Sequence, residues 1–294
     1  MPAISVGLPV YNGQQFVAEA IESILAQSEQ DLELVISDNA STDATGEICE
    51  RYARLDPRVR YHRQATNLGA AVNFSRVFEL STGEYFRWAG VDDKCGPDLL
   101  RRCKAVLDAD PAIAVCVSKV KIIDGDGNVI EDYADRQALL GATPSERFME
   151  LQDQDSWCNS IYGLIRSRVL KQTRLMGSFP GSDIALMAEI ALHGKFHEIP
   201  DYQFFRRIHG EAYSYEYSAE RARAFYDPQR RSRRLQMYHW RLLWEYLRAI
   251  LRAPVGATER RRLLVRLGRI ARWRRKDLLE ELRNLRERSR TQTA

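Results

Sequence analysis

Two adjacent carboxylates follow a strongly apolar segment of the chain. Asp92 and Asp93 come directly after the sequence YFRWAGV at residues 85–91. Paired carboxylates are the hard oxygen ligands that Mg²⁺ and Mn²⁺ prefer, with water and phosphate oxygens completing the coordination. The pair is therefore a candidate metal site. A solvated turn or a helix cap is the alternative interpretation of the same two residues.

Two other polar segments also follow apolar runs that are rich in β-branched residues. The run at 4–10 leads into Tyr11-Asn12-Gly13, and the run at 32–37 leads into Asp38. Neither G-x-G-x-x-G nor G-x-x-x-x-G-K-[ST] occurs, which disfavours a dinucleotide oxidoreductase and a P-loop NTPase. A phosphate bound near these residues would need something other than a glycine-rich loop to neutralise it.

The spacing of the apolar residues predicts strands that alternate with helices. Strands are expected at 4–10, 32–37, 59–61 and 85–89, and helices at 16–25, 45–54, 71–80 and 97–109. This order predicts a mainly parallel sheet covered on both faces, whose ligands bind at the carboxyl ends of the strands. The later expectations are a strand at 114–123, a turn at Asp124–Asn128, a helix at 183–193 and strands near 196–199 and 203–208.

In order and spacing, these motifs resemble family 2 glycosyltransferases with the GT-A fold. The resemblance covers roughly the first 210 residues and is carried by Leu8–Gly13, Ser37–Asp43, Asn67–Gly69 with Asn73, Gly83–Tyr85 and Val91–Asp93. It implies an α/β GT-A catalytic domain over residues 1–215, with nucleotide-sugar binding in 1–95 and the acceptor side in 96–215. Residues 216–294 lie outside it and are expected to form a helical, basic region.

The resemblance implies an inverting transfer from a UDP- or dTDP-sugar to a hydroxyl of a glycan or lipid-linked acceptor, in the synthesis of a cell-surface polysaccharide. It implies that Pro9 and Tyr11 pack against the nucleobase, although Tyr11 as core filling is the alternative. Asp38 matches the residue that accepts the imide N–H of uracil or thymine, and Asn73 falls among the donor-binding residues. Asn39 stands where the family commonly has a second Asp.

The resemblance also implies that Asp92 meets the ribose and that Asp93 coordinates Mn²⁺ or Mg²⁺, which bridges the diphosphate. Asp183 matches an acidic residue at the start of a helix and is the candidate catalytic base, with a helix cap as the alternative. Ser182 replaces the Glu that the family has there. That departure affects the expected acceptor contacts.

The segment Arg206–His209 resembles the family's closing Arg-x-His segment. His209 is a weaker candidate, either as a further metal ligand or as a diphosphate contact, and a surface histidine is the alternative. Arg206 or Arg207 could pair with phosphate.

Composition limits the class of protein. The chain has 294 residues, of which 45% are hydrophobic and 29% charged, which disfavours a disordered chain and a polytopic membrane protein. No stretch approaches the roughly 18 apolar residues of a membrane span, and no signal peptide is recognisable, so a cytoplasmic location is expected. Five scattered cysteines without a CxxC pair indicate neither a disulfide framework nor a zinc site.

The charge is divided unevenly along the chain. From Arg221 to the end there are 22 Lys and Arg against 7 Asp and Glu, a net charge of +15, and the part before it carries −11. Two amphipathic stretches, at 229–252 and 258–290, favour peripheral attachment to the anionic inner face of the cell membrane. The alternatives are packing on the catalytic domain and a homodimer, whereas nucleic-acid binding is disfavoured because no recognition motif is present. A non-catalytic binding or scaffold protein that acts through this tail is the alternative function.

Overall fold

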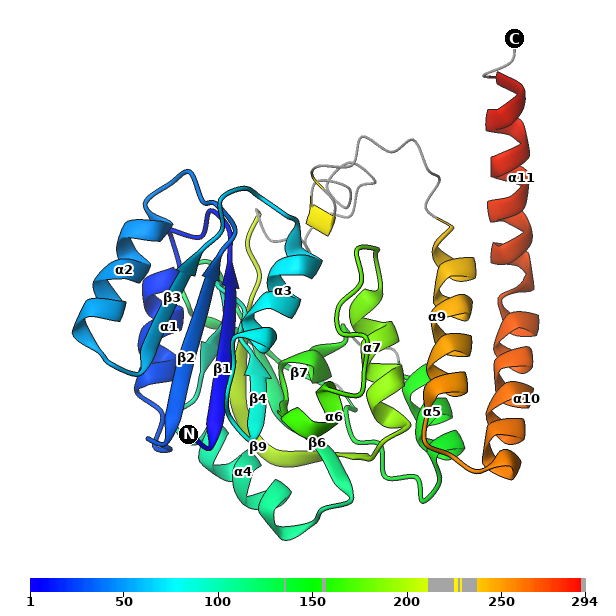
Figure 1. Ribbon diagram of the computed structural model, residues 1–294, viewed down its shortest axis with the longest axis horizontal. Coiled ribbons are helices and arrows are strands. Elements are labelled where there is room, and N and C mark those ends of the chain that lie inside the picture. The colour runs from blue at the N-terminus through cyan, green and yellow to red at the C-terminus, as the bar shows by residue number, and fades with distance from the viewer. Residues whose placement is uncertain (135, 155–156, 211–224, 227, 229–236, 292–294) are drawn as a thin grey trace.

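The computed structural model describes residues 1–134, 136–154, 157–210, 225–226, 228 and 237–291, and is built around one nine-stranded sheet (Figure 1). The strands are β1 (Ile4–Val10), β2 (Leu32–Asp38), β3 (Val59–Arg63), β4 (Tyr85–Trp88), β5 (Lys94–Cys95), β6 (Ile113–Ile123), β7 (Val129–Tyr133), β8 (Leu164–Arg166) and β9 (Lys195–Arg207). The helices of the first 210 residues are α1 (Val17–Leu25), α2 (Thr45–Leu55), α3 (Ala70–Glu79), α4 (Leu99–Ala109), α5 (Pro144–Gln152), the 3-10 helix η1 (Asn159–Tyr162), α6 (Ser167–Leu170) and α7 (Ser182–Ala191).

The sheet is parallel in its first half and mixed in its second. Its order is β3-β2-β1-β4-β8-β6-β9-β5, with β7 paired to β6. Strands β1 to β4 are parallel neighbours, as the sequence predicts. Strand β8 runs antiparallel to both β4 and β6, and β5 and β7 are also antiparallel to their partners. Strands β6 and β9 form a long parallel pair, so the prediction of a mainly parallel sheet is confirmed, and the short antiparallel pairings are what it did not include.

Strand β1 is buried on both faces, which explains its continuous apolar sequence. One face belongs to a core that includes α1 and α4, and the other face meets a core that includes α3 and α7. Gly7 permits the second contact, because a Cβ there would lie 2.7 Å from both Phe86 and Val77.

Strand β9 differs from the prediction because it is one continuous strand where two were expected. Pro200, which has no N–H to donate, lies at a register shift in the pairing of β9 with β6, between Ile199 and Tyr202. The predicted turn at Asp124–Asn128 is confirmed and joins β6 to β7.

Between residues 237 and 291, which the structure describes, the chain forms the helices α9 (Tyr238–Arg252), α10 (Ala257–Trp273) and α11 (Arg275–Thr291), where two stretches were expected. Helix α9 packs on α7, and α10 packs on α9 and α5, around a core that contains Phe148, Leu192, Tyr246 and Leu263. The alternative that the tail packs on the preceding domain therefore describes α9 and α10. The predicted boundary at residue 215 lies outside the described residues. Within the described part, no helix has both the length and the apolar character needed to span a membrane.

Candidate active site

The carboxyl ends of β1, β2 and β4 meet at one edge of the sheet. Val10 pairs with Asp38 in parallel register, and the Asn39 N–H donates to the carbonyl of Val10 at 2.9 Å. Gly13 brings the loop after β1 against Val91 after β4, since a Cβ on Gly13 would lie 2.5 Å from that side chain. The three polar segments that the sequence places after strands are therefore neighbours in space.

The loops after β1 and β2 are locked together by hydrogen bonds. The N–H of Asn12 donates to Ser41 Oγ at 3.0 Å, and Asn12 Oδ1 accepts the N–H of Thr42 at 2.8 Å. Asn12 has a positive φ of 49°, which Asn tolerates better than most residues. Tyr11, next to it, is 47% exposed, so the alternative that Tyr11 fills the core is wrong. A ring that is free at this edge is available for stacking on a nucleobase.

Asp38 and Asn73 are buried and hydrogen-bonded beneath these loops, and Oδ1 of Asn73 has no hydrogen-bond partner among the described residues. Asp38 is buried; its Oδ1 accepts the N–H of Ser41 at 2.8 Å and its Oδ2 accepts the hydroxyl of Tyr61 at 2.8 Å, with Arg63 3.4 Å away. Asn73 donates to the carbonyls that end both strands, at 2.9 Å to Ser37 and 3.3 Å to Val10. Both residues hold the strand ends together, and their direct contact with a nucleotide stays a prediction.

Asn39, in place of a carboxylate, ties the β2 loop to the start of α3. Its Nδ2 donates to Asn67 Oδ1 at 2.8 Å, and its Oδ1 accepts the N–H of Leu68 at 2.9 Å. An amide can make both bonds at once because it carries a donor and an acceptor, whereas a carboxylate only accepts. The substitution at this position therefore has a structural reason.

Asp92 and Asp93 lie together in the loop after β4, with both carboxylates near Gly90. A Cβ on Gly90 would lie 2.4 Å from Asp93 Oδ2 and 3.2 Å from Asp92 Oδ1, so only glycine leaves room for them. Asp93 is 8% exposed, and burial together with the charge of Asp92 raises the pKa of its carboxyl to about 7. The charges of Arg206 and Arg87 act in the opposite direction. Nε2 of His209 lies 3.1 Å from Asp92 Oδ2.

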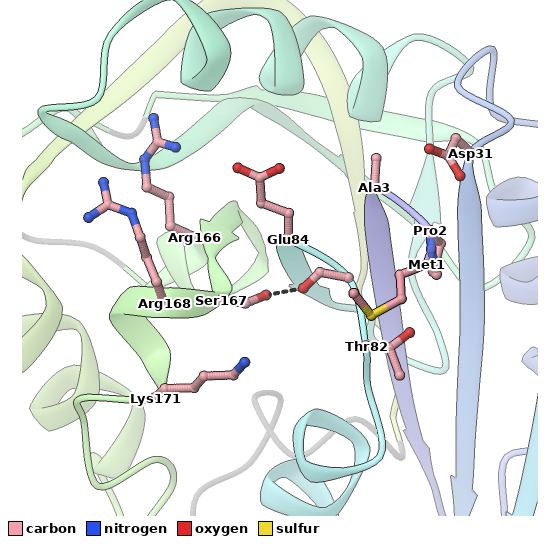
Figure 2. Close-up of a pocket in the computed structure, with 11 residues that line it drawn as sticks. Met1, Pro2, Ala3, Asp31, Thr82, Glu84, Arg166, Ser167, Arg168 and Lys171 are labelled. Carbon is pink, nitrogen blue, oxygen red and sulfur yellow. Dashed lines mark hydrogen bonds between the residues drawn. The ribbon is translucent and has the colours of Figure 1, made fainter.

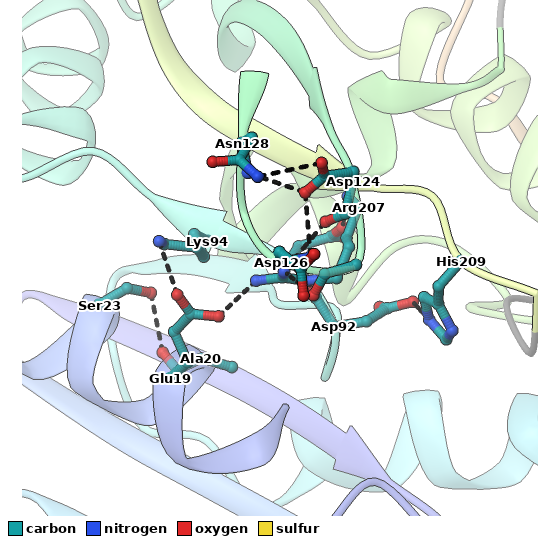
Figure 3. Close-up of polar contacts among 12 residues, drawn as sticks. Glu19, Ala20, Ser23, Asp92, Lys94, Asp124, Asp126, Asn128, Arg207 and His209 are labelled. Atoms are coloured by element: carbon teal, nitrogen blue, oxygen red, sulfur yellow. Dashed lines mark hydrogen bonds and ion pairs between the residues drawn. The ribbon is translucent and has the colours of Figure 1, made fainter. Parts of the chain in front are cut away.

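Arg207 holds this loop in place and is not available to a phosphate (Figure 3). Its buried guanidinium donates Nε to the carbonyl of Asp92 at 2.8 Å, and Nη1 to the carbonyls of Asp124 at 3.1 Å and Gly125 at 2.8 Å. It also pairs with Glu19 of α1, which in turn pairs with Lys94 at 2.6 Å. One arginine thus joins β9, the acidic loop, the β6–β7 turn and α1.

Arg206 has the opposite character, because it faces the site and is partly exposed. Nη1 donates to Asn159 Oδ1 at 2.5 Å, and its guanidinium lies 4.9 Å from the ring centre of Trp157. Its positive charge lowers the pKa of both Asp93 and Asp183. Of the two arginines, Arg206 is the one that is placed to meet a phosphate.

Asp183 lies in the first turn of α7. Its Oδ1 accepts the N–H of Ile184 at 2.9 Å, while Gly181 is the N-cap residue. Burial raises the pKa of the carboxyl. The carboxylate therefore supports the helix start without being its cap, and a raised pKa suits a group that must accept a proton near neutral pH.

The acidic loop and α7 converge on Tyr162. Burial raises the pKa of this phenol, and the negative charges of Asp93, Asp92 and Asp183 raise it further. Electrostatic effects decay with distance, so a shared effect on one phenol indicates that the three carboxylates lie near it. The backbone contacts agree, because β9 binds Asp93 at Arg207, the neighbouring Arg206 reaches η1, and η1 packs on α7.

The structure also shows residues that the motifs did not reveal. The guanidinium of Arg87 is buried behind Asp93, 5.4 Å from the ring centre of Phe204, and none of its nitrogens has a hydrogen-bond partner among the described residues. Its position in a strand of apolar residues was the only signal. Tyr238, the first residue of α9, lies against Gly181, where a Cβ would be 2.8 Å from its ring. Helix α9 therefore begins beside Asp183.

A pocket of about 500 Å³ lies away from these groups, at the amino ends of β1 and β4 (Figure 2). Met1, Glu84, Arg166 and Lys171 contribute to its wall. The guanidinium of Arg166 is already bound to backbone carbonyls, including that of Ile113 at 2.8 Å. None of the candidate site residues lines this pocket.

Comparison with protein families decides the classification. The family model described as Glycosyl transferase family 2 matches residues 5–170. The chain belongs to this family. The match contains the sheet edge, the acidic loop and η1, whereas α7, β9 and the C-terminal helices lie beyond it.

The chain aligns with only part of the length of its curated relatives. The putative teichuronic acid biosynthesis glycosyltransferase TuaG of Bacillus subtilis is 34% identical over 101 residues, which are 34% of this chain and 40% of TuaG. The chondroitin synthase of Escherichia coli is 32% identical over 133 residues, 45% of this chain and 19% of that protein. These relatives support the family but leave the activity of the whole chain to be proposed.

Solved structures share the fold. S. aureus TarS 1–349, in complex with UDP-GlcNAc, has a TM-score of 0.65 at 18% identity and covers 91% of this chain and 72% of that one. The mannosyltransferase PcManGT from Pyrobaculum calidifontis, in complex with GDP-Man and Mn²⁺, has a TM-score of 0.55 at 17% identity and covers 96% and 84%. The expected GT-A fold is thereby confirmed.

The acidic loop fits a divalent ion that is completed by substrate. Among the residues that the structure describes, no three His, Cys, Asp or Glu side chains form a group that could hold a metal by themselves. Mg²⁺ and Mn²⁺ in nucleotide sites commonly use one or two carboxylates and take the remaining ligands from phosphate and water. The acidic loop provides one or two such carboxylates, Asp93 and its neighbour Asp92. A bound cation would also offset the free-energy cost of keeping the buried Asp93 ionised.

Proposed function

We propose that the chain is an inverting, metal-dependent glycosyltransferase that moves a sugar from a UDP- or dTDP-sugar to an acceptor hydroxyl. The observation that carries the proposal is the chain of contacts from the acidic loop to α7: Arg207 at the end of β9 binds Asp93, the neighbouring Arg206 binds η1, and η1 packs on α7, which carries Asp183. Asp92 and Asp93 would hold the donor and the ion, and Asp183 would serve the acceptor. The complexes of TarS with UDP-GlcNAc and of PcManGT with GDP-Man and Mn²⁺ support it by analogy of fold.

The donor would lie along the edge formed by the ends of β1, β2 and β4. Tyr11 offers an exposed ring to the nucleobase, and Pro9 presets the end of β1 beneath it. Asp38 would receive the imide N–H of uracil or thymine through its remaining lone pairs. Asp92 would meet the ribose, and Asp93 the metal, with His209 orienting Asp92 through their 3.1 Å contact.

The diphosphate would be neutralised from two sides. Asp93 would hold Mn²⁺ or Mg²⁺, which would act as a Lewis acid on the departing diphosphate. Arg206, a permanent cation at the mouth of the site, would pair with a phosphate oxygen from the opposite side. No glycine-rich loop is needed under this arrangement.

Asp183 would remove the proton from the acceptor hydroxyl. The acceptor oxygen then forms a bond to the anomeric carbon while the bond from that carbon to the phosphate oxygen breaks, so the configuration inverts and the nucleoside diphosphate leaves with the bonding electrons. The buried carboxylate, with its raised pKa, can hold the proton until the product departs.

The acceptor is proposed to be a growing glycan or a lipid-linked sugar in cell-surface polysaccharide synthesis. The printed roles of TuaG in teichuronic acid biosynthesis and of the chondroitin synthase support this class.

The test is a panel of UDP-, dTDP- and GDP-sugars scored by release of the nucleoside diphosphate, with Mn²⁺ and with EDTA. We expect release with a UDP- or dTDP-sugar in Mn²⁺ only, and its loss in Asp93→Ala. Asp126→Ala removes an exposed carboxylate of the β6–β7 turn and should behave as wild type. Full activity of Asp93→Ala, or the same rate in EDTA, would refute the metal role, and no release from any donor would refute the proposal.

A further inference from the structure

The C-terminal helices use only one side to pack on the domain. The inner residues of α9 and α10, including Leu242, Ile250 and Leu263, close a four-helix cluster with α5 and α7. Their other apolar residues remain exposed. These are Trp240, Trp244 and Leu251 on α9, Leu264, Val265 and Trp273 on α10, and Leu279 and Leu282 on α11.

The exposed apolar residues of α9 form a stripe, whereas those of α10 are spread over the part of the helix that faces away from its buried residues. On α9, Trp240, Trp244 and Leu251 are spaced by four and seven positions, which places them on one helical face, opposite the buried Leu242 and Tyr246. Helix α10 runs beside α9 (Figure 1). Its Leu264 and Val265 are exposed, whereas its Leu263 and Ile270 are buried. We name the exposed apolar residues of α9, α10 and α11, with the arginines between them, the outer surface of the tail.

The charged residues of these helices also differ between the inner and the outer side. Most of the acidic residues bind groups within the protein: Glu245 pairs with Arg174 and Arg241, Glu259 accepts the N–H of Ser145, and Glu281 binds His239, whereas Glu280 is exposed. Basic residues occupy the exposed positions. The exposed basic residues that have no acidic partner among the described residues are Arg252, Arg261, Arg269, Arg272, Arg275, Lys276 and Arg283, and the half-buried Arg260 and Arg266 also have none.

We propose that the outer surface of the tail docks on an anionic lipid bilayer. Tryptophan is favoured at the headgroup boundary, where its ring is buried and its N–H stays wet, and each nearby arginine adds attraction to acidic lipids. A second copy of the chain would bring two strongly basic surfaces together, which is unfavourable in a symmetric interface. A bilayer satisfies both the exposed apolar residues and the surplus positive charge.

Docking would hold the catalytic domain close to the membrane. Tyr238 at the start of α9 lies against Gly181, two positions before Asp183, and the exposed stripe begins at Trp240. The step from α9 to Asp183 is therefore short. This consequence rests on the proposed function, because it makes a lipid-linked sugar the natural acceptor.

The experiment is sedimentation of the full chain with vesicles of phosphatidylcholine alone and with an equal part of phosphatidylglycerol, at low and high salt. We expect binding to the anionic vesicles at low salt and little binding to the neutral ones. The variant Arg261→Gln, Arg269→Gln, Arg272→Gln should bind on the order of a hundredfold more weakly. Its matched control, Arg51→Gln, Arg54→Gln, Arg101→Gln, removes three exposed arginines of α2 and α4 and should bind as wild type.

The apolar contribution has its own pair of variants. Trp244→Ser with Trp273→Ser should lose binding and the blue shift of fluorescence on vesicles, whereas Val129→Ser with Ile130→Ser, exposed on β7, should not. Absence of binding, or equal loss in both members of a pair, overturns the proposal. A wild-type dimer that dissociates in the tail variants without vesicle binding assigns the surface to a second copy instead.

Donor cleavage without vesicles separates this proposal from the proposed function. The arginine and tryptophan variants should cleave donor at the wild-type rate, because none of these residues contacts the carboxylates. Vesicle binding by a chain that cleaves no donor would leave the docking intact and refute the enzyme, and the reverse result would refute only the docking.

Discussion

The backbone N–H of Arg207 donates a 2.9 Å hydrogen bond to Oδ1 of Asp93 across 114 positions of the chain. The bond fixes one oxygen of the carboxylate at the end of β9, while Oδ2 has no hydrogen bond among the described residues. The end of β9 therefore orients a residue that the motif pattern places on the loop after β4. Closure of the sheet, and not the local sequence, sets the geometry of the acidic pair.

Asp93→Asn should stabilise the metal-free protein at alkaline pH. An acid whose folded pKa of about 7 exceeds its unfolded value near 3.9 keeps its proton longer in the folded state, so stability falls as pH rises between those values. The amide carries no such penalty. We expect the free energy of unfolding in urea and EDTA to be about 1–3 kcal/mol higher for Asp93→Asn than for wild type at pH 8, and the difference to vanish near pH 4. An identical pH dependence in both proteins would contradict the raised pKa.

Asp183→Asn should lose catalysis and keep the fold. The Asn side-chain oxygen can still accept the N–H of Ile184, whereas it cannot take a proton, so kcat is expected to fall by roughly 10²–10⁴. Thr143→Ala is the calibrating control, since Thr143 is a true N-cap of α5, and it should cost about 1 kcal/mol of stability with kcat unchanged. The base assignment fails if Asp183→Asn instead resembles Thr143→Ala in single-turnover assays.

The sheet edge could be predicted from sequence because its strands are local and buried on both faces. Such strands are continuous apolar runs, and parallel strands end at a common edge, so the polar residues that follow them must meet. This reasoning located Tyr11, Asp38 and the pair Asp92 and Asp93. It did not distinguish residues that hold the edge together from residues that face a ligand, because hydrogen-bond partners such as Tyr61 arrive from elsewhere in the sheet.

The later half was predicted less well, for identifiable reasons. Pro200 suggested a break between two strands, but a register shift accommodates it within β9. Arg206 and Arg207 alternate across a strand, so one must point inward, and the sequence does not say which one. In the tail, glycine disfavours helix, yet Gly268 lies inside α10. The boundary between α10 and α11 lies at Arg274 instead.

Arg206 and Arg207 should therefore give opposite phenotypes. Arg207→Met leaves the carbonyls of Asp92, Asp124 and Gly125 without this donor and removes one of the two cationic partners of Glu19, so it should cost about 3–5 kcal/mol of stability. Arg206→Met should leave the melting temperature within a few degrees of wild type and raise the KM for donor, with partial recovery in Arg206→Lys. Thermal unfolding and donor titration of the three variants decide the matter. Loss of stability in Arg206→Met with unchanged KM would reverse the two roles.

Tyr11→Ala should weaken donor binding through the nucleobase. The ring is half exposed at the sheet edge, and stacking of a base on an aromatic ring contributes about 1–3 kcal/mol, so the Kd of UDP is expected to rise between about fivefold and a hundredfold. Tyr11→Phe keeps the ring and should bind UDP as wild type does. Calorimetric titration with UDP and with pyrophosphate separates the parts of the donor, since only UDP binding should change. An equal loss for both ligands, or a loss in Tyr11→Phe, would mean that Tyr11 acts through its hydroxyl or the loop and not by stacking.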